Sequence, residues 1–177
     1  MASLVLTLIG PDRPGLVEMI AQTIADHGGN WLESRMSRLA GQFAGILRAE
    51  VPEDRAPDLE AALRELADRG LRVVVEQSQA GTATDARRAL SLELVGTDRP
   101  GIIREISQAL AARGVNVDEL HTECSTAPMS GEALFKATAR LHAPPDLTDQ
   151  ELGEELEKIS ADMMVHIELT REERLTG

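Results

Sequence analysis

Aromatic residues are scarce in this sequence: its 177 residues include one Trp, two Phe and no Tyr. Because a surface that stacks nucleic-acid bases is built from aromatic side chains, we do not expect such a surface. The single cysteine, Cys124, permits no intramolecular disulfide. The sequence also lacks a run of roughly 18 apolar residues that could span a membrane, and a signal-type segment at its start. We therefore expect a soluble, cytoplasmic protein with no membrane contact.

Positive charge is also in short supply. The formal net charge is −12, with 8 basic and 13 acidic side chains in residues 1–86 and 10 and 17 in residues 87–177. Both halves would repel a phosphate backbone, because the negative charge is spread along the chain and not confined to a tail. The sequence therefore predicts no direct binding of nucleic acid.

The most informative feature is an internal repeat with an offset of 86 residues. Residues 10–15 read Gly-Pro-Asp-Arg-Pro-Gly, and residues 96–101 read Gly-Thr-Asp-Arg-Pro-Gly. A Gly-x-Asn pair follows each loop at the same offset, at 28–30 and at 114–116. A repeat of this length indicates two copies of one structural unit.

The hydrophobic pattern of each copy predicts the element order β-α-β-β-α-β. Alternating apolar positions indicate strands, and apolar positions three or four residues apart, ended by glycine, indicate helices. The expected strands are 3–9, 30–38, 43–51 and 71–75, then 90–95, 115–124, 132–141 and 165–169; the expected helices are 14–27 and 59–70, then 102–113 and 152–159, with a polar break at 52–57. We assign domain 1 to residues 1–80, a linker to 81–88, domain 2 to 89–171 and a flexible tail to 172–177. The second hairpin has a longer tip at 125–131, which leaves its role open.

Two such units, each with an Asp-Arg-Pro-Gly loop after the first strand and a Gly-x-Asn pair after the first helix, resemble tandem ACT domains, the ligand-sensing modules of amino-acid metabolism. The resemblance implies an α+β fold of two ferredoxin-like domains, with antiparallel sheets and with helices on one face. Formyltetrahydrofolate deformylases begin with a similar unit, but their catalytic domain is a further stretch of chain, and here the second half repeats the first.

A chain with two such units also resembles the glycine cleavage system transcriptional repressor family, whose members are understood to act through a partner activator. This resemblance implies a regulatory protein without enzyme activity that senses a small amino acid, glycine being one candidate, and modulates a partner transcriptional regulator. The alternative is an amino-acid-responsive regulatory subunit of a metabolic enzyme.

The repeated loops are the candidate ligand sites. Each loop opens a helix whose first amide groups lack intrahelical partners, and these donors attract a carboxylate. An aspartate nearby could hold the ammonium group of the same zwitterion. The aspartates could instead cap the helices, with the prolines in the first turn, and the asparagines could adopt left-handed turns. The candidate ligand residues are Asp12, Arg13, Gly15 and Asn30, with their counterparts Asp98, Arg99, Gly101 and Asn116.

Other polar residues give weaker evidence of a functional site than the two loops do. Glu119, His121 and Glu123 share one face of a strand, a pattern more typical of a wetted sheet surface than of a metal site. Cys124 has no base at a suggestive spacing, so we expect no catalytic residue, no metal and no cofactor. A single sheet of this kind leaves edge strands exposed, and we therefore expect a homodimer.

Overall fold

The structure is a computed structural model that describes residues 1–78 and 87–172. The chain divides into two compact units, Met1–Ala83 and Thr84–Gly177. We call their described parts domain 1 and domain 2 and treat each by itself. Most of the predicted linker and tail lies outside the described residues. Within the described ones, no helix is long and apolar enough to cross a bilayer.

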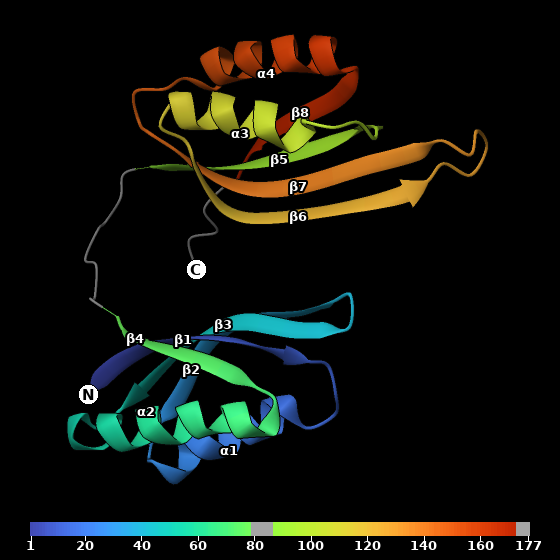
Figure 1. The fold of residues 1–177 in the computed structure, drawn as a ribbon. Coiled ribbons are helices and arrows are strands. Elements are labelled where there is room, and N and C mark those ends of the chain that lie inside the picture. Colours follow the sequence, from blue (N-terminus) through green and yellow to red (C-terminus); the bar gives the residue numbers. More distant parts are fainter. Residues whose placement is uncertain (79–86, 173–177) are drawn as a thin grey trace. The chain divides into compact units, whose positions relative to one another are not determined.

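Domain 1 is one antiparallel sheet, in the strand order β2-β3-β1-β4, with its two helices on one face (Figure 1). Alternation decides which face is buried: Leu4, Leu6 and Leu8 of the first strand point under the helices and are almost fully buried. The elements are β1 (Ala2–Pro11), α1 (Leu16–Asp26), β2 (Asn30–Leu39), β3 (Gln42–Val51), α2 (Ala56–Glu65) and β4 (Arg72–Gln77).

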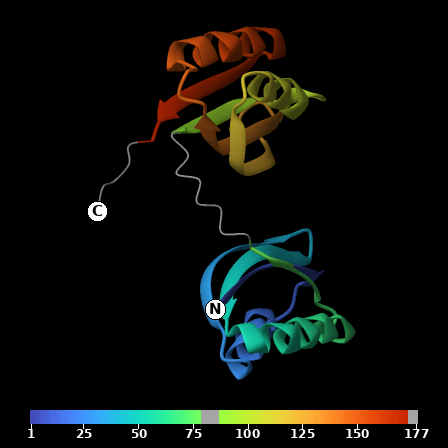
Figure 2. The same cartoon turned by 90° about the vertical axis from the view of Figure 1, so that its left-hand side faces the viewer.

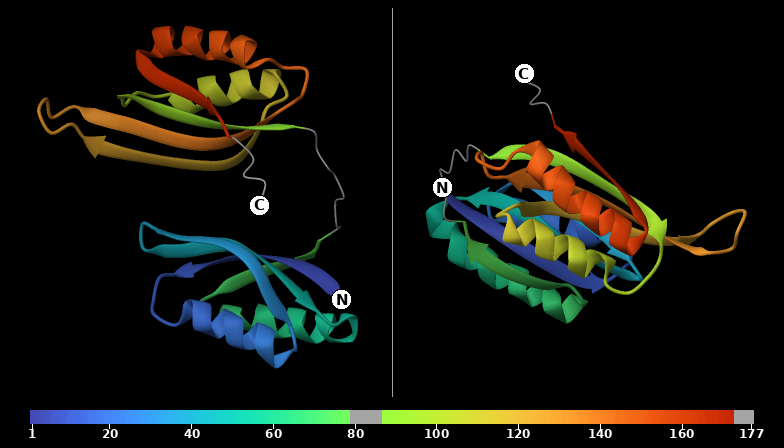
Figure 3. Two further views of the ribbon diagram at one scale, coloured as in Figure 1. Left: turned by 180° about the vertical axis from the view of Figure 1, so that it is seen from behind. Right: turned by 90° about the horizontal axis from the view of Figure 1, so that it is seen from above.

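Domain 2 repeats this arrangement with the strand order β6-β7-β5-β8 and again has both helices on one face (Figure 2). Its longer hairpin, formed by β6 and β7, projects beyond the ends of the helices (Figure 3). The hairpin tip is held by hydrogen bonds from Ala127 N to Glu132 O, 2.8 Å, and from Gly131 N to Ala127 O, 3.1 Å. The elements are β5 (Arg88–Thr97), α3 (Ile102–Ala112), β6 (Asn116–Thr126), β7 (Ala133–Ala143), α4 (Asp149–Met163) and β8 (Val165–Arg171).

The predicted fold class and element order are therefore confirmed, with two local differences in domain 1. The polar segment 52–57 is not a simple break, because a short 3₁₀ turn at Glu53–Arg55 leads directly into α2 at Ala56. Pro57 is accommodated in the first turn of α2, where a missing backbone N–H costs no hydrogen bond. The expected single helix also ends early, and a second 3₁₀ turn covers Leu66–Arg69.

Candidate functional site

The two repeated loops have the same backbone geometry at the helix entrances. Gly15 precedes α1 with φ 90° and ψ 1°, and Gly101 precedes α3 with φ 93° and ψ 0°. A side chain is strained at these angles, which explains the glycine in both copies. Each glycine is the N-cap residue, and no side-chain hydrogen bond caps either helix in the described structure. The first amide groups of α1 and α3 therefore remain available to an anion.

This geometry contradicts the interpretation of the aspartates as helix caps. Asp12 and Asp98 lie three residues before the N-cap glycines, and their side chains accept no hydrogen bond from the amide groups of the first helical turn. Their backbone N–H groups instead donate to the facing hairpins, Asp12 to Gly41 O at 2.9 Å and Asp98 to Ala133 O at 2.8 Å. The prolines likewise precede the N-cap and do not sit in the first helical turn.

In domain 1 the loop side chains contact two elements that are distant in sequence. The carboxylate of Asp12 lies 3.8 Å from Arg38 Nε, on the β2–β3 hairpin. Arg13 donates from Nη2 to the backbone carbonyl of Arg69, at the end of the 3₁₀ turn before β4. Asp12 and Arg13 thus point to different neighbours, and each already has a partner.

A groove of about 430 Å³ runs from this loop along α1. Two arginines and two carboxylates line it, so it offers both signs of charge to a zwitterion. Glu18 and Asp26 share one helix face because they are eight residues apart, a spacing that is visible in the sequence. No local sequence pattern predicted that Arg69 would line this groove, because only the fold brings Arg69 to the loop. The lining residues are Arg13, Pro14, Gly15, Glu18, Met19, Gln22, Thr23, Asp26 and Arg69.

The loop of domain 2 differs in its surroundings. Arg104 projects from the first turn of α3, and its Nη2 lies 3.0 Å from Glu105 Oε1. A Cβ built on Gly101 would lie 3.7 Å from Arg104 Nη2, whereas one built on Gly15 would meet nothing within 4 Å. The two loops therefore have the same backbone conformation at the glycine but different charged neighbours.

The asparagines lie at the other end of each sheet from the aspartates. On β3, Gln42 pairs with Pro11 beside the loop, and Glu50 pairs with Asn30. The eight residues from Gln42 to Glu50 span about 26 Å at a strand rise of about 3.3 Å per residue. One small ligand therefore cannot touch both Asp12 and Asn30 of the same domain.

Domain 2 separates Asp98 and Asn116 in the same way, because Thr97 pairs with Leu134 and Asn116 with His142. The asparagine turn expected at these positions is also wrong. In the described part of the chain the left-handed residues there are Gly28 (φ 69°) and Gly114 (φ 67°), and each asparagine begins a strand. Asn116 donates from Nδ2 to Asp118 Oδ1 at 2.8 Å, and Asp118 also pairs with His142.

The polar stripe on β6 lies on the sheet face opposite the helices. Glu119, His121 and Glu123 are opposite Arg140, Thr138 and Lys136 of β7, so they do share one face. Glu119 Oε1 lies 3.6 Å from Arg140 Nη1. Among the described residues, no group of three His, Cys, Asp or Glu side chains lies close enough to hold a metal ion.

Fold and loops together define a class of protein: two ferredoxin-like domains in tandem, each with an uncapped helix entrance after its first strand. The comparisons with known proteins agree. Family models for the ACT domain match residues 2–76 and residues 90–160. The chain belongs to the ACT domain family and carries two copies of that domain.

Three further similarities extend over most of the chain. The glycine cleavage system transcriptional repressor of Escherichia coli (strain K12) is 24% identical over 142 residues, which cover 80% of this chain and 75% of that protein. A crystal structure of an unknown protein from Galdieria sulphuraria has a TM-score of 0.87 and 28% identity, covering 97% of this chain and 99% of that one. A crystal structure provisionally assigned as a glycine cleavage system transcriptional repressor has a TM-score of 0.72 at 17% identity, with 98% of each chain covered.

Proposed function

We propose that this protein is a regulator without enzyme activity that senses a small amino acid, glycine for example, and modulates a partner transcriptional regulator. The observation that carries the proposal is the pair of uncapped helix entrances in two ACT domains. The similarity to a named transcriptional repressor over 80% of the chain supports the regulatory role. We place the protein in the cytoplasm, where regulators of transcription and metabolism act.

The proposed site is the loop after the first strand of each domain. The ligand carboxylate would accept hydrogen bonds from the free amides after Gly15 or Gly101, aided by the helix dipole. The guanidinium groups of Arg13 and Arg99 would strengthen binding of the same anion. Asp12 and Asp98 would receive the ammonium group, with Asp12 exchanging its distant partner Arg38 for the ligand.

Asn30 and Asn116 belong to a different contact in this proposal. Because each lies about 26 Å from the loop of its own domain, it would reach a loop-bound ligand of a second copy of the chain. A homodimer formed through the exposed edge strands would supply such a neighbour. Light scattering at micromolar concentration tests this: a mass of about twice 19.1 kDa supports the dimer, and a monomer contradicts it.

Size limits the affinity that such a site can reach. Glycine has about five non-hydrogen atoms, and a ceiling near −1.5 kcal/mol per atom corresponds to a dissociation constant of about a few micromolar. We expect values of roughly tens of micromolar to millimolar, suited to sensing a metabolite pool. A calorimetric titration of the purified protein with each of the twenty amino acids tests the proposal directly. Heat that saturates for one or a few of them supports it, and no saturation up to about 10 mM contradicts it.

The partner separates the proposed function from its alternative, a regulatory subunit of a metabolic enzyme. A transcriptional regulator should be recovered with the tagged protein if the first proposal holds. A metabolic enzyme recovered in its place, with activity that changes when the amino acid is added, would favour the alternative. Turnover of a metabolite by the isolated protein would contradict both.

A further inference from the structure

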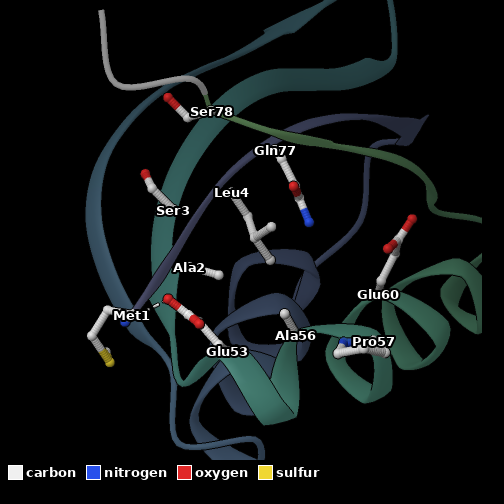
Figure 4. A pocket seen from close by; sticks show the side chains of 10 residues that line it. All are labelled: Met1, Ala2, Ser3, Leu4, Glu53, Ala56, Pro57, Glu60, Gln77 and Ser78. Carbon is white, nitrogen blue, oxygen red and sulfur yellow. Dashed lines mark ion pairs between the residues drawn. The ribbon is translucent and has the colours of Figure 1, made fainter. Parts of the chain in front are cut away.

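A second pocket lies in domain 1, at the end of the sheet away from the repeated loop. It is an open pocket bordered by the start of β1, the end of β4 and the first turns of α2 (Figure 4), and its volume is about 450 Å³. This volume falls within the range of about 300–1,000 Å³ that is typical of small-molecule sites. The lining residues are Met1, Ala2, Ser3, Leu4, Glu53, Ala56, Pro57, Glu60, Gln77 and Ser78.

The internal repeat shows what fills the same place in domain 2. Arg88 begins β5 as Ala2 begins β1, and Asp149 begins α4 as Ala56 begins α2. Arg88 is half-buried; it donates from Nη1 to the carboxylate of Asp149 and from Nη2 to the carbonyl of Leu147. Domain 2 therefore holds a guanidinium group of its own at this position.

A second arginine completes the cluster in domain 2. Arg171 Nη2 donates to Asp149 Oδ2 at 2.8 Å. Arg171 pairs with Leu90 on β5, and the matching pair in domain 1 is Gln77 with Leu4. Arg88, Asp149 and Arg171 of domain 2 therefore correspond to Ala2, Ala56 and Gln77 of domain 1. The shorter side chains of the two alanines leave the space open as a pocket.

Domain 1 places its carboxylates differently from domain 2. It lacks the carboxylate of Asp149, because Ala56 stands at that position, but Glu60, the fifth residue of α2, lines the pocket, and the fifth residue of α4 is Gly153, which has no side chain. Glu53 contributes a second carboxylate from the 3₁₀ turn before α2. The site thus combines an empty volume with carboxylates, where its repeat holds a guanidinium group.

The partners that these carboxylates already have are weakly held. Glu53 lies 3.6 Å from the terminal ammonium of Met1, and its side chain is 80% exposed (Figure 4). Glu60 pairs with Arg64 one helical turn on, and the side chains of Glu60 and Arg64 are 34% and 65% exposed. Exposed ion pairs of this kind contribute little to stability, so an incoming cation can replace them at small cost.

We infer that this pocket between β1 and α2 binds a small molecule with a guanidinium or primary ammonium group, taking the place that Arg88 fills in domain 2. Glu60 and Glu53 would hold the cation, and the amide of Gln77 would offer a further acceptor. The site is separate from the repeated loops, so this inference goes beyond the proposed function. It adds a cationic ligand to the amino-acid zwitterion proposed for the loops.

Calorimetry with L-arginine as the probe tests the inference, and L-citrulline is the control, because it has the same shape without the charge. We expect saturable binding of arginine and at least about tenfold weaker binding of citrulline, since a charged hydrogen bond to a carboxylate is lost. Equal binding of the two, or no heat from arginine up to about 10 mM, would overturn the inference.

Variants locate the bound arginine. Ala2→Arg places a guanidinium of the chain in the pocket and should weaken binding about tenfold or more, and Glu60→Gln should weaken it about three- to tenfold. Glu65→Gln is the matched control, an exposed glutamate on the same helix, and should bind as the unmodified protein does. If Ala2→Arg lowers the melting temperature, the double variant Ala2→Arg/Ala56→Asp rebuilds the ion pair of domain 2 and should still exclude the probe.

A loop variant separates this inference from the proposed function. Gly15→Val alters the β1–α1 loop and should leave the affinity for arginine unchanged. If Gly15→Val removed arginine binding while Ala2→Arg and Ala2→Arg/Ala56→Asp kept it, arginine would be bound at the loop, and the inference of a second site would be wrong.

Discussion

Gly10 lies directly against the backbone carbonyl of Gly70, such that a Cβ built on Gly10 would be 2.4 Å from Gly70 O. The counterpart in domain 2 is packed as closely, because a Cβ on Gly96 would be 2.5 Å from Val165 Cγ1. Both glycines are strand residues of β1 and β5, although they open the repeated loop motif in the sequence. The first glycine of each motif is therefore required by close packing, against Gly70 just before β4 in domain 1 and against Val165 at the start of β8 in domain 2, and the second glycine is required by its backbone angles.

This contact predicts a stability effect. Gly10→Ala should destabilise domain 1 by about 1–3 kcal/mol, because the new methyl group has no space beside a backbone atom. Gly153→Ala is the control: it lies within α4, nothing is within 4 Å of the added carbon, and it should stabilise domain 2 by about 0.5–1 kcal/mol. Urea unfolding of both variants measures the difference. A neutral Gly10→Ala would contradict the close packing.

Asp98→Ala separates a ligand contact from a structural role. Gly101 is the N-cap of α3, so loss of the Asp98 carboxylate removes no cap and should leave the melting temperature unchanged. If Asp98 holds the ammonium group, the affinity for the amino acid should fall by about 1–3 kcal/mol. Glu157→Ala, an exposed residue of α4, is the control for a lost negative charge. Full affinity in Asp98→Ala would exclude Asp98 from the site.

The two loops should not bind ligand equally. Gly15→Val and Gly101→Val both impose a side chain on a left-handed backbone and should each weaken binding at their own loop. Their effects should differ, because the first loop faces the groove with Arg69 and the second faces the Arg104–Glu105 pair. Calorimetric titration of each variant with the amino acid gives the two losses. Equal losses would argue that the loops are equivalent.

The start of α4 predicts a pH effect on domain 2. Thr148 donates from its backbone N–H and its hydroxyl to Glu151, and these bonds lower the pKa of that carboxyl below its ordinary value. A lowered folded-state pKa adds stability that is complete above the unfolded-state pKa and is lost as pH falls through the folded value. Glu151→Gln should therefore flatten the decline in stability between about pH 5 and pH 3.

Urea unfolding at several pH values gives this slope for domain 2, and Glu154→Gln on the same helix is the charge-matched control. An unchanged slope in Glu151→Gln would contradict a lowered pKa of the Glu151 carboxyl. Thr148→Ala should in addition cost about 1 kcal/mol at neutral pH, because the hydroxyl also accepts the Glu151 amide, 3.2 Å away, at the N-cap.

The charge of the chain predicts its behaviour towards DNA. With a net charge of −12, the purified protein should not retard duplex DNA at near-physiological salt, because both domains repel the phosphate backbone. Any effect on transcription in a reconstituted system should then require a partner protein. Salt-sensitive retardation by the protein alone would contradict this expectation.

The sequence by itself determined the duplicated architecture. Alternation of Leu4, Leu6 and Leu8 identifies a strand with one buried face, and the spacing of Ile102, Ile106 and Leu110 identifies an amphipathic helix, because both periods are properties of a few neighbouring residues. Repeating those patterns at a fixed offset was enough to predict two βαββαβ units and their loops. Local signals were weaker at helix starts, where the cap proved to be Gly15 and not Asp12.

Only the tertiary structure decided which side chains meet. Strand pairing places Asp12 beside Arg38 and puts Asn30 at the far end of the sheet, although both Asp12 and Asn30 were predicted to be ligand residues of domain 1. Likewise, the pocket beside Ala2 exists because a strand start, a helix start and a strand end converge there. Such contacts depend on the register between elements that are dozens of residues apart, and no local pattern in the sequence specifies that register.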